Sequence, residues 1–191
     1  VGKLNKAKGY DIFVKSIKNV LDKHKDWKAI VIGDEKREKI SLKHKNASIL
    51  GFRKHSDVIK IFKQTSITVA CSRWEEPFGR TSLEASANGC AVIITNKGGL
   101  PETVTDAKII ENLNEKNLTK IITTLISNNK LRRNLQERSI RNFYLTHKFV
   151  SNNIDDYRSE KLYLKKNFFI KSKLKSLRIL HVTNFNERLD G

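Results

Sequence analysis

Short, unbroken runs of apolar residues alternate with segments of helical spacing along this 191-residue chain. Strands that are covered on both faces have such runs, whereas half-exposed strands alternate apolar and polar residues. The runs comprise residues 29–33, 47–50, 67–71 and 90–95. Between them, apolar residues recur three and four positions apart, as in residues 10–21 and 58–62. The pattern predicts an α/β fold with a doubly wound parallel sheet, followed by C-terminal helices.

Ligands of doubly wound sheets bind beyond the carboxyl ends of the strands, so the loops that follow the apolar runs are the candidate sites. The opening loop, residues 1–9, contains Gly2, Lys3 and Lys8. Gly2 permits close approach of the backbone, and the two cations can converge on one diphosphate across a turn. The alternative is a lysine-rich turn that is simply solvated.

A second loop, directly after the third run, carries two carboxylates, Glu76 and Glu84, with seven residues between them. A helix is expected to begin near Arg80 and to end at Gly89, a residue type typical of the position after a helix. The free N–H groups of its first turn would form an anion site, and a carboxylate on each side suits the recognition of hydroxyl groups. The competing interpretation is a capping box, in which Glu84 folds back onto the backbone of Thr81.

A third loop follows the fourth run and contains Gly98 and Gly99. Two glycines let a backbone approach a ligand closely, although an ordinary turn explains them equally well. The two cysteines, Cys71 and Cys90, lie at opposite ends of neighbouring predicted strands, too far apart for a disulfide. We expect both to be free and buried, as in a reducing compartment.

The formal net charge is +18, and it is distributed along the chain. Residues 1–150 carry +14 of it and residues 151–191 carry +4. Such a field attracts anionic partners, namely nucleotide phosphates, nucleic acid or an anionic membrane surface, unless the lysines only solvate the surface. No apolar run approaches the length of a membrane span, and the five histidines lack metal-ligand spacing.

Taken in their order after the strands, these loops resemble the donor-binding, C-terminal half of retaining glycosyltransferases of the GT-B fold, in the group 1, or family-four, type. The resemblance extends from Val1 to about Tyr157. Its most specific part is residues 72–94, with the two carboxylates seven residues apart, followed by residues 98–102, GGLPE.

The resemblance implies transfer of a sugar from a nucleoside diphosphate to an acceptor hydroxyl with retention of anomeric configuration, and it implies no metal cofactor. Lys3 and Lys8 would neutralise the pyrophosphate, and Glu76 would meet the donor sugar. The other implied donor-binding residues are Gly2, Gly51, Arg53, Phe78, Gly79, Arg80, Thr81 and Glu84. Lys3 stands where the family more often has arginine, so its phosphate contact would be a point charge rather than a bidentate fork.

The same resemblance implies a division of the chain into three parts. Residues 1–150 would be the donor-binding domain, with a truncated first strand, and residues 151–176 a C-terminal helix or basic linker. Residues 177–191 would begin a second, acceptor-binding domain, the alternative being an unrelated C-terminal strand. Because the acceptor-binding half that should precede Val1 is missing, we expect the chain alone to be inactive.

The expected partners are a nucleotide sugar and a glycan or lipid-linked glycan acceptor. We expect a cytoplasmic location, with peripheral contact to an anionic membrane as an open option. A phosphorylase or epimerase of the same fold is the nearest alternative function. A basic nucleic-acid-binding module is a distant one, because the charge is spread and no aromatic-plus-basic motif accompanies it.

Overall fold

A computed structural model describes residues 1–169 of the chain, in two units. The first unit, Val1–Leu145, contains two parallel sheets. In one sheet β1 (Ala29–Val31) pairs with β2 (Ala47–Ile49). In the other, β4 (Ala91–Thr95) lies between β3 (Ile67–Ala70) and β5 (Ala107–Ile110). All three strand pairs are parallel, so within each sheet the carboxyl ends of the strands lie at the same edge.

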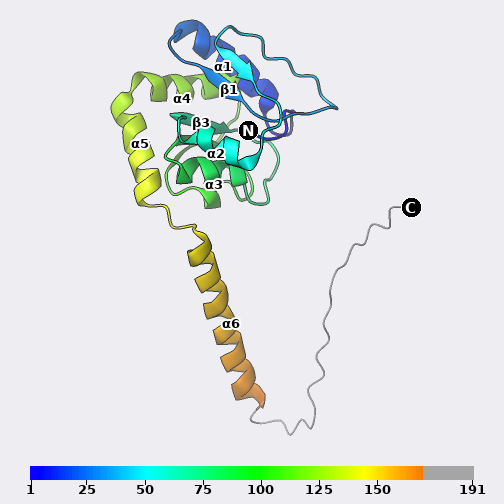
Figure 1. Cartoon of the computed structure of the whole chain (residues 1–191), viewed down its shortest axis with the longest axis vertical. Helices are drawn as coiled ribbons and strands as arrows, with labels where there is room; N and C mark the ends of the chain where they lie inside the picture. The colour runs from blue at the N-terminus through cyan, green and yellow to red at the C-terminus, as the bar shows by residue number, and fades with distance from the viewer. Residues whose placement is uncertain (170–191) are drawn as a thin grey trace, which may run out of the picture. The chain divides into compact units, whose positions relative to one another are not determined.

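The strand β4 is covered on both faces of its sheet. All five of its residues are buried. Ile93 belongs to a core with α1 (Tyr10–Lys23) and α4 (Glu115–Ser127). Val92 and Ile94 belong to a second core, with α2 (His55–Phe62) and α3 (Arg80–Ala87). Figure 1 shows the strands between these two pairs of helices. The predicted doubly wound sheet is therefore confirmed.

Asparagine side chains cap the starts of two helices, α4 and α5 (Asn129–Arg141). Asn114 precedes α4, and its side chain accepts a hydrogen bond from the backbone N–H of Asn117, at 2.8 Å. Asn128 does the same for α5, at 2.8 Å to the N–H of Leu131. A short 3-10 helix, η1, spans Pro101–Thr103. Such side-chain caps satisfy N–H groups that have no partner inside the helix.

The boundaries of β1, β2, β3 and β4 agree with the predicted apolar runs to within two residues. The helix α2 begins three residues before the predicted segment 58–62, and β5 lies outside the four predicted runs. The predicted end of α3 is confirmed, because α3 stops at Ala87 and Gly89 follows with φ of 75°. Cys71 and Cys90 are free and buried, as predicted. Burial raises the pKa of the Cys71 thiol to about 12.

The second unit begins at Thr146, and its described part is α6 (His147–Phe169). The boundary predicted at residue 150 falls inside this helix, and the predicted start of a further domain at residues 177–191 lies outside the described residues. Among the described helices, none is long and apolar enough to cross a membrane.

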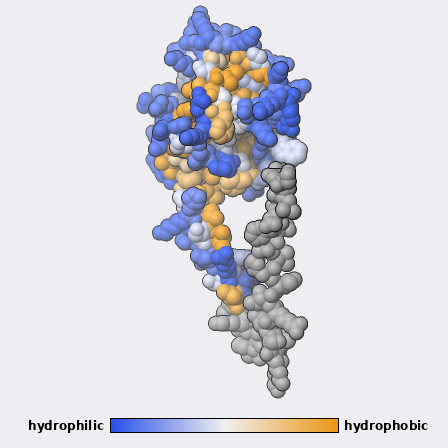
Figure 2. All heavy atoms as spheres, turned by 45° about the vertical axis from the view of Figure 1, so that its right-hand side comes forward, coloured by the Kyte–Doolittle hydropathy of each residue, from blue (hydrophilic) through white to orange (hydrophobic). Residues whose placement is uncertain are grey.

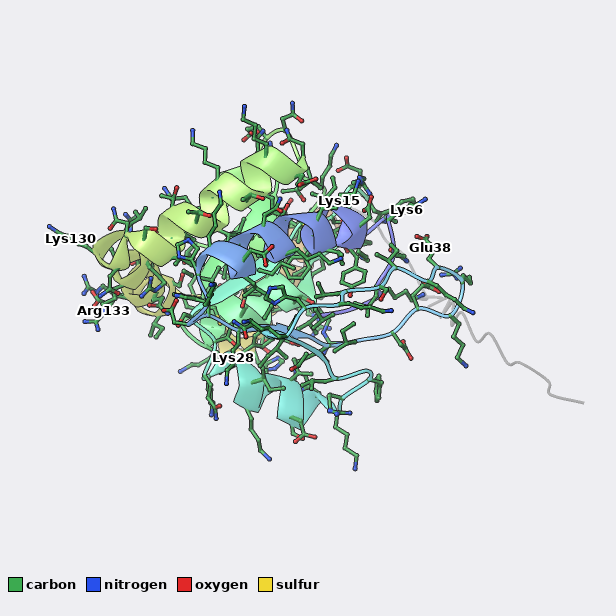
Figure 3. All side chains as sticks on the ribbon, turned by 90° about the horizontal axis from the view of Figure 1, so that it is seen from above. Lys6, Lys15, Lys28, Glu38, Lys130 and Arg133 are labelled. Atoms are coloured by element: carbon green, nitrogen blue, oxygen red, sulfur yellow. The ribbon has the colours of Figure 1, made fainter. Side chains whose placement is uncertain are left out.

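Hydrophilic side chains cover most of the face of the first unit seen in Figure 2. Figure 3 shows that the basic side chains point outward from separate elements, with Lys15 on α1 and with Lys130 and Arg133 on α5. The positive charge is thus spread over this unit, in agreement with the distribution along the sequence.

Candidate functional site

The opening loop is held by a buried asparagine. Asn5 is 8% exposed, and its side-chain oxygen accepts a hydrogen bond from the backbone N–H of Lys8, at 3.0 Å. Its amide nitrogen donates to Glu35, at 3.1 Å. The Arg37 side chain also bonds to Glu35 and is the main reason why the pKa of that carboxyl falls to about 2. The start of the loop is held as well, because the N–H of Gly2 donates to the carbonyl of Ile32, at 2.9 Å, so both ends of the loop that carries Lys3 and Lys8 are fixed by hydrogen bonds.

An arginine connects this loop to the one after β3. Arg73 forms a bidentate ion pair with Asp11, at 2.7 and 2.9 Å, and this contact lowers the pKa of the carboxyl. The backbone N–H groups of Arg73 and Trp74 both donate to the carbonyl of Ala7, at 2.8 and 3.1 Å. These bonds bring Lys8 opposite Glu76, two residues beyond Trp74.

Lys8 and Glu76 form an ion pair in which the Glu76 side chain is only 12% exposed. The glycine turn after β4 contacts the backbone of Glu76. The N–H of Gly99 donates to the carbonyl of Glu76, at 2.6 Å, and a side chain at Gly98 would collide with the Glu76 backbone. The structure therefore shows the two glycines approaching protein backbone, in the manner of a structural turn.

The helix α3 begins beside this pair. Gly79 precedes it with φ of 87°, in the left-handed region that favours glycine, and no side chain caps the helix. Because Thr81 is already the second helical residue, the alternative interpretation of Glu84 as half of a capping box with Thr81 is wrong. Glu84 instead accepts hydrogen bonds from the imidazole of His55, at 3.0 Å, and from Arg80, at 3.3 Å. The first N–H groups of α3 remain without intrahelical partners.

One cavity of about 440 Å³ collects most of the predicted site residues. Those that line it are Gly2, Lys3, Lys8, Glu76, Gly79, Arg80 and Thr81. These residues surround one end of the cavity, beyond the carboxyl-terminal ends of the strands. There Lys3, Lys8, Glu76 and the start of α3 lie close together. Anions are stabilised at such a place by the cations and by the helix dipole.

Four predicted residues do not line this cavity. Glu84 lies further along α3, with its side chain 19% exposed. The carbonyl of Gly51 accepts from the N–H of Gly33, at 2.9 Å, and Arg53 donates to the carbonyl of Phe52, at 3.0 Å. Phe78 is 51% exposed. The structure thus separates the residues that line the cavity from these four, and of the four Glu84 contacts His55, which follows the loop that carries Gly51 and Arg53.

Sequence reasoning missed the partners that hold the site residues. His55 carries no local signal of a site residue, yet its imidazole contacts Glu84 across 29 positions of the sequence. No local pattern predicts the pair of Asp11 and Arg73, which are 62 positions apart. In residues 1–169, no three side chains of the types that bind metals gather.

The comparison with protein families decides which family this geometry represents. Residues 1–142 match the model of the family described as glycosyl transferases group 1. The chain belongs to this family.

Related proteins agree with the assignment. A solved structure of the C-terminal domain of a group 1 glycosyl transferase (LpcC) from Francisella tularensis is 28% identical, with a TM-score of 0.66. The alignment covers 74% of this chain and 80% of the chain in that structure. The mannosyltransferase LpsB of lipopolysaccharide core biosynthesis, from Rhizobium meliloti, is 33% identical over 54% of this chain and 32% of its own length.

Anabaena HepE in complex with UDP shows the same fold at 22% identity, with a TM-score of 0.64 over 84% of this chain and 48% of that one. The chain spans less than half the length of the curated relatives it matches here, including that mannosyltransferase.

Proposed function

We propose that residues 1–145 bind the nucleoside-diphosphate sugar donor of a retaining glycosyltransferase. The observation that carries the proposal is the meeting of Lys3, Lys8, Glu76 and the start of α3 at one end of a single cavity. A diphosphate needs positive charge and N–H donors, and a sugar or ribose needs carboxylates that accept from hydroxyl groups. This cavity and its rim offer both kinds of group within a few residues of one another.

The cations and the helix would act on the leaving group. When the anomeric C–O bond breaks, negative charge grows on the diphosphate, and fixed positive charge lowers the barrier if it is already in place. Lys8 is held in place by its ion pair with Glu76, and its backbone N–H by Asn5. The free N–H groups at Arg80 and Thr81 add the partial positive charge of the helix end. This arrangement supplies charge stabilisation from the chain's own residues, and we propose no metal.

The two carboxylates would recognise hydroxyl groups. Glu76 pairs with Lys8 through one oxygen, and its second oxygen would accept from a hydroxyl of the donor sugar. Glu84 is held by His55 and Arg80 through Oε1, which leaves Oε2 for the ribose hydroxyls. Gly51 and Arg53 would lie beside the base, and Phe78 beside the sugar.

The relatives favour a transferase over a phosphorylase or an epimerase. One relative is a mannosyltransferase, and HepE of the same fold binds UDP. Retention of anomeric configuration is proposed from the family type. The acceptor would be a glycan or a lipid-linked glycan, reached by a cytoplasmic protein with peripheral contact to an anionic membrane through its spread positive charge.

We further propose that transfer requires an acceptor-binding half that these residues do not supply. Donor and acceptor atoms must be held about 3 to 3.5 Å apart for reaction, and one face of a cleft cannot do this alone. The 191-residue chain would then bind the donor without transferring the sugar. Robust transfer by the purified chain would contradict this part of the proposal.

Calorimetric titration with UDP, GDP and ADP, with their sugar derivatives and with the bare nucleosides tests the proposal. One diphosphate should bind measurably, and its nucleoside should bind at least tenfold more weakly. The matched pair of variants is Lys8→Ala and Lys97→Ala, because Lys97 forms a similar ion pair with neighbouring Glu75, at 3.0 Å. If no diphosphate binds, or if both variants bind equally well, the proposal fails.

A further inference from the structure

An imidazole and a carboxylate from two neighbouring helices form a hydrogen bond. His55 is the first residue of α2, and its Nε2 lies 3.0 Å from Oε1 of Glu84 on α3. An ionised carboxylate only accepts hydrogen bonds, so the imidazole donates and carries a proton on Nε2. The side chain of His55 is 61% exposed, whereas that of Glu84 is 19% exposed. The bond therefore fixes one oxygen of a carboxylate that is itself mostly enclosed.

The backbones that carry these two side chains are held by the core. Phe62 of α2 and Ala85 of α3 are buried in the same core, at 2% and 0% exposure. The side chain of Asn88 also donates to the carbonyl of Glu84, at 2.7 Å. The freedom that remains to the carboxylate is rotation about its own side-chain bonds, and the hydrogen bond from His55 restricts this rotation.

Arg80 is the second partner of the carboxylate and a weaker one. Its Nη2 lies 3.3 Å from the same Oε1, and its side chain is 74% exposed. Exposed pairs four residues apart on one helix contribute little to the folded state. Arg80 also lines the cavity, whereas His55 does not. A diphosphate bound in the cavity would therefore compete for Arg80, and it would leave the bond between His55 and Glu84 in place.

His55 also lies between two parts of the proposed donor site. It directly follows residues 51–54, the loop that carries Gly51 and Arg53. Through its side chain it contacts the carboxylate that is proposed to bind the ribose. In a nucleotide the ribose connects the base to the phosphates, so its hydroxyl groups must meet a carboxylate at a fixed place relative to the base. The bond from His55 holds Glu84 at such a place.

We propose that His55 is a positioning residue, which keeps Oε2 of Glu84 directed to the ribose hydroxyl groups and thereby sets the preference for a ribonucleotide over a deoxynucleotide. This inference rests on the proposed function, which assigns the ribose to Glu84. His55 acts through the carboxylate and does not contact the nucleotide. Without His55 the glutamate must be ordered when the ligand binds, and ordering one such side chain lowers the affinity about 2- to 12-fold.

Calorimetric titration of the whole chain tests the proposal. The ligands are whichever of UDP, GDP and ADP binds most tightly, and its 2′,3′-dideoxy analogue. The measured quantity is the ratio of the two affinities, because a general loss of folded protein lowers both affinities and leaves their ratio unchanged. His55→Ala should lower this ratio about 2- to 12-fold by weakening the ribonucleotide alone.

Two amides of different length test the geometry of the bond. His55→Gln places an N–H close to the position of the imidazole Nε2–H, so it should restore the native ratio. His55→Asn carries the same amide group, but its N–H lies near the position of Nδ1 and cannot reach Glu84. It should therefore behave like His55→Ala. The two variants are matched because both keep a neutral, polar side chain at the start of α2.

A double variant separates positioning from direct contact. In the Glu84→Ala chain, a further His55→Ala change should leave the affinity for the ribonucleotide unchanged, because the carboxylate through which His55 acts is gone. A further loss would show that His55 contacts the ligand itself, and it would overturn the proposal. A native ratio in His55→Ala, or equal ratios in His55→Gln and His55→Asn, would overturn it as well.

Failure of this inference can be told apart from failure of the proposed function. If Glu84→Ala loses the preference for the ribonucleotide while His55→Ala keeps it, Glu84 binds the ribose without help from His55, and only the inference is wrong. If Glu84→Ala also keeps the native preference, or if no diphosphate binds, the assignment of the ribose to Glu84 is wrong and the inference fails with it.

Discussion

Replacing Glu84 with alanine separates a hydroxyl-binding role for this carboxylate from a purely structural one. In the structure it does not cap α3, which begins at Arg80 after Gly79. Its two contacts are with side chains that are themselves exposed, His55 at 61% and Arg80 at 74%. Exposed ion pairs contribute about 0.2–1 kcal/mol, and i,i+4 helix pairs such as Arg80 and Glu84 only about 0.3–0.5 kcal/mol. The free energy of unfolding should therefore fall by less than about 1 kcal/mol, so the melting temperature should fall by no more than about 2–4 °C.

The expected effect on binding is larger. A hydrogen bond to a charged group contributes about 1.5–3 kcal/mol, so Glu84→Ala should weaken the binding of the preferred nucleoside diphosphate about 10- to 150-fold. The assay is calorimetric titration with the ribonucleotide and with its 2′,3′-dideoxy analogue. The native chain should bind the dideoxy analogue about as weakly as the variant binds the ribonucleotide, and the variant should not distinguish the two.

The control is Asp57→Ala, which removes a carboxylate paired with Lys60, at 3.5 Å, on the neighbouring helix α2. It should leave both affinities unchanged. The reasoning is refuted if Glu84→Ala lowers stability while leaving the affinity intact, or if it weakens the ribonucleotide and the dideoxy analogue by the same factor.

Three further predictions concern the lysine, the buried thiol and the link between the loops. Lys8→Ala should lower the affinity for a diphosphate about tenfold or more and the affinity for its nucleoside little, with a smaller loss at high salt because the contact is electrostatic. Lys97→Ala should change both affinities by less than about twofold. Equal losses for diphosphate and nucleoside would indicate a folding defect. Cys71, with its raised pKa of about 12, should resist alkylation by iodoacetamide at pH 8 until the chain is unfolded in urea, and rapid native labelling would contradict its burial. Arg73 lowers the pKa of Asp11 in the folded state, so the contribution of the ion pair to stability is present above the unfolded pKa of about 4 and is lost as the pH falls through the lower folded value. In urea unfolding from pH 6 to pH 2, the free energy of unfolding should therefore depend less on pH in Asp11→Asn. An unchanged pH dependence would count against the ion pair.

The strands could be predicted from sequence because their signal is local. A run such as residues 90–95 is typical of a strand that is covered on both faces, and β4 is buried along its whole length. The two ends of α3 could be predicted equally well, because Gly79 adopts the left-handed conformation before the helix and Gly89 adopts it after the helix. These features depend on residues close together in the chain.

The contacts that hold the site could not be predicted in this way. The imidazole of His55 reaches Glu84 only because α2 and α3 pack against the same face of the sheet. Gly98 and Gly99 are typical of a ligand-binding loop, yet they approach the protein's own backbone, at residues 75–78. The division of the strands into two sheets is a property of the strand order, which no single segment encodes.

The most direct test of the central claim is an amide chemical-shift titration of the isotope-labelled chain with UDP, GDP and ADP. The account predicts that one of them shifts the backbone N–H signals of Arg80 and Thr81 at the start of α3, together with that of Lys8, and that the corresponding nucleoside leaves these signals nearly unchanged. Shifts confined to other parts of residues 1–145, or no shift with any of the three at millimolar concentration, would contradict the assignment of this cavity to a nucleoside diphosphate.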